Sequence, residues 1–316
     1  MAANPQFDMG PGSDPVLLQR LSLLASHLVV ALVALVGIGG ATRVMEAGLA
    51  CPDWPLCYGQ FLPGRQMNVQ VFLEWFHRLD AFVVGVALLV LTAASYVLRR
   101  RLPGWLPWAA AGSLLLVAVQ GALGALTVSQ LLASPLVTAH LGTALLLVAL
   151  CSGLYQRLAI VGRDLAAPPL WWLVLAAIAM GLVLAQCLLG GSMASQWAAD
   201  QCLSQGNGCS WLLAHRQLAM PAALAVLALA ATTPLLPRGL GQLPALALAA
   251  AGLVGLQVAL GVWTLKLQLQ APLVTIGHQL TAALLVGLLA AVLARCLGSP
   301  GKAVSSARLA PEVIHG

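Results

Sequence analysis

Apolar residues occur along this chain in long continuous runs, separated by short stretches rich in charged residues, proline and glycine. A helix that crosses a bilayer needs about 20 mostly apolar residues, because the hydrocarbon core is about 30 Å thick. Eight runs reach this length, and the alternation typical of membrane strands is missing from them. The pattern therefore predicts an all-α integral membrane protein with eight transmembrane helices. The expected spans are residues 21–41, 71–98, 105–127, 135–155, 170–191, 211–231, 244–264 and 272–294.

The composition supports a chain that lies in lipid. Of its 316 residues, 60% are hydrophobic and 8% are charged, whereas roughly a quarter of the residues in a soluble protein are charged. The same values exclude a disordered chain and a small secreted disulfide scaffold. The net charge of +6 is explained by the membrane topology described next, so no nucleic acid partner is expected.

Basic residues are distributed unevenly between the two sides of the predicted membrane. With a cytoplasmic N-terminus, ten lie inside and five outside, as the positive-inside rule requires. The first twenty residues resemble neither a cleavable signal peptide nor an organelle transit peptide. We therefore expect a multi-pass protein of a prokaryotic plasma membrane with both termini in the cytoplasm. The inner residues are Arg20, Arg99, Arg100, Arg101, Arg157, Arg163, Arg238, Arg295, Lys302 and Arg308.

The two halves of the chain resemble each other. The segment Gln120-Gly-Ala-Leu-Gly-Ala-Leu-Thr127 matches Gln257-Val-Ala-Leu-Gly-Val-Trp-Thr264, and a His-Arg pair opens the second span of each half. We therefore predict two repeated four-helix bundles in the same orientation. They comprise residues 21–156 and 170–295, with cytoplasmic tails at 1–20 and 296–316.

Four histidines occupy matched positions in this repeat. His77 and His215 lie in the second span of each half, His140 and His278 in the fourth, and the separation within both pairs is the same. All four fall near the outer face, in the first turns of helices that run inward. An ionisable residue within a span is costly and indicates function, and neutral imidazole binds haem iron. The pattern predicts one haem site in each half, although helix capping and hydrogen bonding between helices are the alternatives.

Glycines and arginines accompany the histidines at the same depth. Arg78 and Arg216 each follow a histidine, as possible partners of a haem propionate or as interfacial anchors. The glycines permit close approach of either a porphyrin or another helix, and the sequence does not decide between these. They are Gly39, Gly40, Gly124, Gly190, Gly191 and Gly261.

Four cysteines lie in matched outer loops. An oxidising compartment permits disulfides, so the pairs Cys51–Cys57 and Cys202–Cys209 are predicted to form two local bridges. We interpret Cys202–Cys209 as structural, whereas Cys51–Cys57 is either a structural bridge or a redox-active dithiol.

One carboxylate has no counterpart in the repeat. Glu74 precedes His77 by three residues and shares its helical face, whereas the matching position before His215 is Leu212. The carboxylate either complements the positive helix N-terminus or takes part in chemistry. We therefore hypothesise that the N-terminal half is catalytic and that the C-terminal half passes electrons.

Together, these features resemble the haem A synthase family, which matures haem for cytochrome oxidases. The resemblance is carried by Gly39-Gly40-Ala-Thr-Arg43, Cys51-Pro-Asp-Trp-Pro-Leu-Cys57 and Glu74-Trp-Phe-His77-Arg78, with His140, His215-Arg216 and His278. It extends from the first span to the eighth.

The resemblance implies that haem O is the substrate. Its C8 methyl would be hydroxylated twice, and the product would lose water to leave the formyl group of haem A. Carried over to this chain, His77 and His140 hold the substrate haem, His215 and His278 hold a haem b cofactor that relays electrons, and Glu74 is catalytic. Haem O synthase, cytochrome oxidase assembly factors and an electron donor that the sequence does not identify are the implied partners.

Three other functions use the same residues. A di-haem b-type cytochrome that only transfers electrons would need the histidines but neither Glu74 nor exchange of a substrate. A membrane thiol–disulfide oxidoreductase would use the loop cysteines without iron. A haem chaperone would bind haem and leave its methyl group unchanged.

Overall fold

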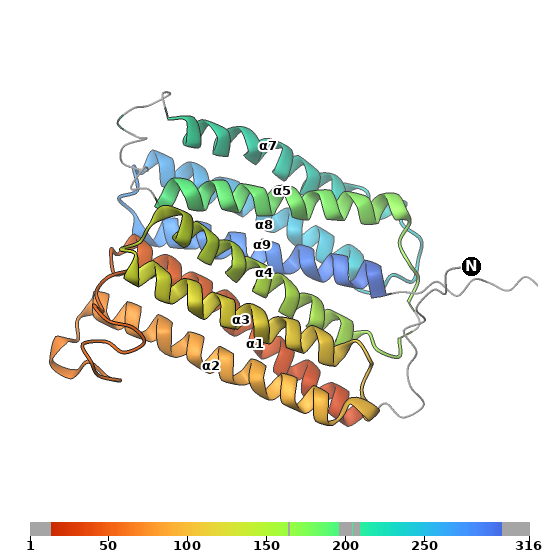
Figure 1. Ribbon diagram of the computed structural model, residues 1–316. Coiled ribbons are helices and arrows are strands. Elements are labelled where there is room, and N and C mark those ends of the chain that lie inside the picture. The colour runs from red at the N-terminus through yellow and green to blue at the C-terminus, as the bar shows by residue number, and fades with distance from the viewer. Residues whose placement is uncertain (1–13, 164, 196–203, 205–208, 299–316) are drawn as a thin grey trace, which may run out of the picture.

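A computed structural model of the chain describes residues 14–163, 165–195, 204 and 209–298. Within this part of the chain, eight helices are long and apolar enough to cross a membrane. Each predicted span falls in one of these helices to within a residue, which confirms a polytopic all-α protein. The helices are α1 (Pro15–Val44), α2 (Val69–Val97), α3 (Leu106–Ser129), α4 (Ser134–Ala159), α5 (Leu170–Ser195), α7 (Ser210–Ala231), α8 (Leu243–Lys266) and α9 (Pro272–Gly298) (Figure 1).

The sequence around the helix starts explains where several helices begin. The carboxylate of Asp14 accepts hydrogen bonds from the first backbone N–H groups of α1, and the side chain of Asn68 does the same for Val71 in α2. These contacts satisfy donors that have no partner within a helix. Proline stands in the first turn of α1, α3, α4 and α8, where its missing N–H costs nothing.

The four helices of each half pack in a ring. In the N-terminal half α1 contacts α2 and α4, and α3 contacts the same two helices; in the C-terminal half α5 and α8 each contact both α7 and α9. The halves meet where α9 packs against α1 and α4, and where α4 packs against α5. Figure 1 shows the two groups of helices side by side along their full length. Each half therefore encloses its own interior between four helices.

Polar contacts join α4 of the N-terminal half to α9 of the C-terminal half, and tie the end of α9 to the start of α8. Ser152 of α4 donates a 2.6 Å hydrogen bond to the carbonyl of Gly287 in α9. Arg295 of α9 donates from Nε to Gln156 Oε1 at 2.6 Å and from Nη2 to Gln242 Oε1 at 3.0 Å. These bonds fix α9 between the halves.

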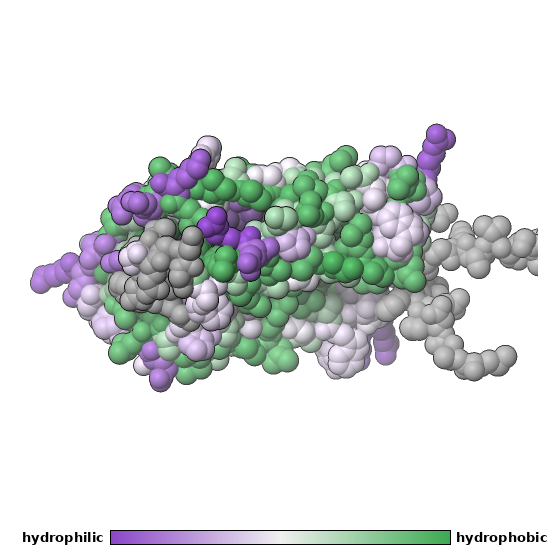
Figure 2. All heavy atoms as spheres, turned by 90° about the horizontal axis from the view of Figure 1, so that it is seen from above, coloured by the Kyte–Doolittle hydropathy of each residue, from purple (hydrophilic) through white to green (hydrophobic). Residues whose placement is uncertain are grey.

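The surface of the bundle is apolar between its two ends. Large side chains such as Trp108, Leu273 and Val97 are more than 70% exposed, and hydrophilic residues gather mostly toward the ends (Figure 2). Exposed apolar surface on this scale is stable only in lipid. The chain is therefore a multi-pass membrane protein.

Candidate functional site

The four histidines lie in the first turns of α2, α4, α7 and α9. These helices all begin at the same end of the bundle, which we call the loop end because it carries the loop of residues 45–68 between α1 and α2 (Figure 1). The structure therefore gives the four side chains a common depth.

The structure brings His77 and His140 together across the N-terminal half. Their ring centroids are 6.4 Å apart and the ring planes meet at 74°. Two imidazoles bound to one metal at about 2 Å each have centroids about 6 Å apart. In the C-terminal half, His215 and His278 are near enough to interact electrostatically.

Each histidine ring packs against a glycine of a neighbouring helix. A Cβ atom at any of these glycines would lie 2.9–3.3 Å from Cε1 of the ring, closer than ordinary van der Waals contact. The glycines therefore let the helix backbone approach the imidazole, an explanation that the sequence had left open. The pairs are Gly39 with His77, Gly124 with His140, Gly190 with His215, and Gly261 with His278.

Two Gly-Gly pairs lie near the histidines, one on α1 and one on α5. In each pair the second glycine contacts a residue of the other half. Gly40 of α1 faces the side-chain amide of Gln279, the residue after His278, and a Cβ there would lie 2.7 Å from Oε1. Gly191 of α5 faces Leu141, the residue after His140, also at 2.7 Å. The helix that supports a histidine in one half thus contacts the histidine-bearing helix of the other half.

Glutamine amides reach three of the four histidines, which the sequence analysis did not anticipate. The amide Nε2 lies 3.3 or 3.4 Å from the ring Nε2 in each case. A signal was present in the repeat, since two of the three glutamines open the matched segments of α3 and α8. The pairs are Gln120 with His140, Gln186 with His215, and Gln257 with His278.

The rings fit axial haem ligation by their hydrogen-bonding groups. Nδ1 of His278 lies 3.1 Å from the backbone oxygen of Gln257. Nδ1 of His77, His140 and His215 is buried without a hydrogen-bond partner, although a carbonyl of the neighbouring helix lies close to each ring. With Nδ1–H directed at a backbone carbonyl, Nε2 is the nitrogen that would bind a metal. In His140, His215 and His278 a metal would take the place of the contact with the glutamine amide. Two such rings facing each other suit a haem iron.

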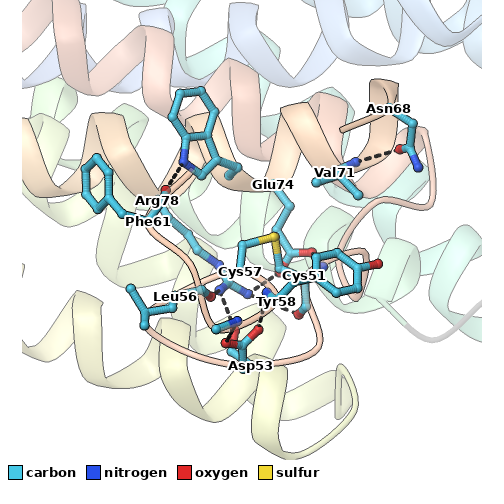
Figure 3. Close-up of a disulfide and its surroundings, with 12 residues drawn as sticks. Cys51, Asp53, Leu56, Cys57, Tyr58, Phe61, Asn68, Val71, Glu74 and Arg78 are labelled. Carbon is cyan, nitrogen blue, oxygen red and sulfur yellow. Dashed lines mark hydrogen bonds and ion pairs between the residues drawn. A yellow bond between two sulfur atoms is a disulfide. The ribbon is translucent and has the colours of Figure 1, made fainter. Parts of the chain in front are cut away.

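Glu74 and Arg78 form an ion pair that holds the loop of residues 45–68 (Figure 3). Glu74 is 4% exposed and accepts a 2.8 Å hydrogen bond from the backbone N–H of Cys51. Arg78 Nη2 lies 2.5 Å from Glu74 Oε1, while Nη1 donates to the carbonyls of Asp53 and Leu56, both at 2.5 Å. One turn before His77, the carboxylate predicted to be catalytic is thus bonded through one oxygen to the loop and through the other to Arg78 of its own helix.

The two arginines of the His-Arg pairs have different surroundings. The guanidinium of Arg78 is engaged by the loop, whereas Arg216 is exposed. Leu212, at the position matching Glu74, is buried. The contrast that the sequence indicated between the two halves therefore extends to the arginines.

Cys51 and Cys57 form the predicted disulfide. Both residues are buried, at 0% and 1% exposure, which favours a structural bridge over a dithiol that exchanges with external thiols. Of the second predicted pair, Cys209 is buried, and Cys202 lies outside the described residues, so that pairing stays a prediction.

Asp80 is a further residue that the sequence analysis missed. It is half-buried in α2, three residues after His77 and therefore on a similar face of the helix. The available signal was a carboxylate inside an apolar span, which is costly and often functional.

Residues 21–211 match the family described as cytochrome oxidase assembly protein. The chain belongs to this family. The chain is 30% identical to the heme A synthase of Sphingopyxis alaskensis, over 83% of this chain and 88% of that protein. It is also 30% identical to the heme A synthase of Caulobacter vibrioides, over 80% and 89%. The heme A synthase of Shewanella oneidensis is 31% identical over 60% of this chain and 61% of its own. These relatives confirm the resemblance drawn from the motifs.

Proposed function

We propose that this protein is a haem A synthase, which oxidises the C8 methyl of haem O to a formyl group for cytochrome oxidase. The observation that carries the proposal is the pair of facing imidazoles, His77 and His140, with ring centroids 6.4 Å apart. The family and the heme A synthase relatives, similar over most of the chain, support the same reaction.

In this proposal the N-terminal half binds the substrate. His77 and His140 would hold haem O between them, and the surrounding apolar helices would keep water away from it. Glu74 contributes from the same half by holding the loop of residues 45–68 in place one turn before His77, a role supported by its bonds to Cys51 and Arg78.

The C-terminal half binds the cofactor. His215 and His278 hold haem b, which supplies one-electron chemistry when it is bound. The contacts of Gly40 with Gln279 and of Gly191 with Leu141 support a short path between the two sites. A matching carboxylate is not needed in this half, in keeping with Leu212 at the position of Glu74.

The remaining proposals concern the orientation of the protein in the membrane and its partners. We propose that both termini are cytoplasmic, because the basic residues favour that side. The loop end then faces outward, where an oxidising compartment suits the disulfide. The substrate comes from a haem O synthase, and the product goes to cytochrome oxidase assembly. Each hydroxylation of the methyl group needs dioxygen as the oxidant, and two electrons from an external donor with two protons convert its second oxygen atom to water.

The proposal is tested by identifying the haems that the purified protein contains. The chain is expressed in a membrane that supplies haem O, and extracted haems are separated and identified by mass. We expect haem b together with haem A, and no haem A from His77→Ala. Haem b alone from the unmodified chain, with haem O supplied and left unchanged, would instead indicate an electron-transfer cytochrome.

A further inference from the structure

The residue one helical turn before each ring-contacting glycine sets His77 apart from the other three histidines. Three of these positions are glutamine and the fourth is leucine, which has no hydrogen-bonding group. Each lies on the helix that carries the glycine, and its backbone carbonyl faces the ring. The residues are Gln120 for His140, Gln186 for His215, Gln257 for His278, and Leu35 for His77.

Two of the glutamines tie neighbouring helices together at the level of the ring. Gln120 Nε2 donates to the carbonyl of His140 at 3.0 Å, and Gln186 Nε2 donates to the carbonyl of His215 at 2.8 Å. Gln120 also accepts a hydrogen bond from Thr143, which fixes its orientation. A hydrogen bond between membrane helices stabilises their packing, and here it restricts the turn that bears the ligand.

The third glutamine, Gln257, restrains the ring of His278 with its backbone carbonyl, which lies 3.1 Å from Nδ1 of the ring. The side-chain amide nitrogen of Gln257 lies 3.4 Å from Nε2 of the same ring. In all three cases the position of the ring is therefore held by the residue one turn before the glycine.

His77 lacks the glutamine amide and has near its ring only the backbone carbonyl of Leu35. Its Nδ1 is buried without a hydrogen-bond partner, as are those of His140 and His215. The difference lies at Leu35, whose side chain packs against the apolar core and has no amide to donate. Glu74 and Arg78 tie this stretch of α2 to the loop of residues 45–68. Toward α1, however, the His77 ring packs on Gly39 without a side-chain hydrogen bond among the described residues. Packing alone leaves a ring freer to rotate than packing together with a hydrogen bond.

We propose that His77 is the releasable ligand of the substrate haem, and that Leu35 is the positioning residue that makes it so. This inference rests on the proposed function, in which one half must exchange its haem and the other must keep it. His140, restrained by Gln120, stays on the iron while His77 withdraws. In the C-terminal half both ligands are restrained, as a resident cofactor requires.

The first experiment compares Leu35→Gln with Leu35→Met in the full-length protein loaded with haem O. The two new side chains are similar in length, but only glutamine can donate to the carbonyl of His77. We measure transfer of the haem to excess apomyoglobin and binding of carbon monoxide to the reduced protein, which requires a vacated axial position. Leu35→Gln should slow both processes about three- to tenfold relative to Leu35→Met, the range expected for one hydrogen bond between membrane helices. Equal rates for the two variants would overturn the proposal.

The reciprocal experiment uses the C-terminal half and needs no turnover. Gln186→Met removes the bond to the carbonyl of His215, so haem b should begin to bind carbon monoxide and should transfer to apomyoglobin faster. The low-spin electron paramagnetic resonance signal of the bis-histidine haem should decrease in parallel. A haem b as inert as in the unmodified protein would also overturn the proposal. Because this arm reports on haem b alone, it separates failure of the inference from failure of haem A synthesis, which appears as haem O left unoxidised.

Discussion

Gly40 and Gln279 meet at the boundary between the two halves, with the glycine so close that a Cβ would lie 2.7 Å from the amide oxygen. Gly39 packs on His77, and Gln279 follows His278 in the chain. The two residues therefore connect a ligand of one proposed haem site to a ligand of the other. Any side chain larger than hydrogen at position 40 must displace α9 or its glutamine.

Gly40→Val should destabilise the packing of α1 on α9. The branched side chain overlaps the amide of Gln279, which must swing away. Because this neighbour is flexible, we expect a cost of about 1 kcal/mol, the low end of the range for overpacking. The measurement is thermal unfolding of the purified protein in detergent. Gly85→Val on α2 is the control, since a Cβ at Gly85 meets nothing within 4 Å. Equal unfolding temperatures for the two variants would show that the contact is unimportant.

Gly190→Ala should lower the affinity of the C-terminal half for haem b. The added Cβ lies 2.9 Å from Cε1 of His215, so the ring must move away from its ligating position. A displacement that costs about 1.4 kcal/mol reduces binding tenfold. Haem b per protein is measured after titration with haem. Gly181→Ala on the same helix, where a Cβ has open space, should bind as the unmodified protein does.

Glu74→Gln should loosen the loop of residues 45–68. The substitution keeps an acceptor for the N–H of Cys51 but removes the charge that pairs with Arg78. Hydrogen bonds to charged groups contribute about 1.5–3 kcal/mol. Reduction of the Cys51–Cys57 disulfide by dithiothreitol should therefore be faster, and haem A formation should fall.

A second variant tests the same ion pair from the other side. Arg78→Lys keeps the positive charge but cannot bind Glu74 and the carbonyls of Asp53 and Leu56 at once. It should accelerate reduction of the disulfide as Glu74→Gln does. If the disulfide reacts at the original rate in both variants, the ion pair does not hold the loop.

The double variant Cys51→Ser/Cys57→Ser should be less stable and still active. Six positions separate the two cysteines, and closing such a short loop contributes about 2 kcal/mol. Both sulfurs are buried, so we expect a structural bridge. Haem A production at reduced temperature should persist, together with a lower unfolding temperature. Complete loss of haem A with both haem sites filled would instead indicate a redox role for the dithiol.

Features that depend on stretches of the chain or on repetition could be predicted from the sequence. The eight helices follow from the length of the apolar runs, because a bilayer sets that length. The Cys51–Cys57 disulfide follows from two cysteines in one short loop. The convergence of His77 and His140 was expected from the matched spacing of the four histidines in the repeat.

The contacts around each histidine could be decided only by the tertiary structure. The glycine under each ring, the glutamine amides and the crossing of Gly40 with Gln279 depend on how each helix is rotated about its axis. A soluble helix reveals that rotation by its apolar face, but these helices are apolar on nearly every side, because lipid and protein interior are equally hydrophobic. The sequence placed Glu74 on the same helical face as His77 by spacing. Only the structure shows that its carboxylate bonds to Cys51 in the loop and to Arg78.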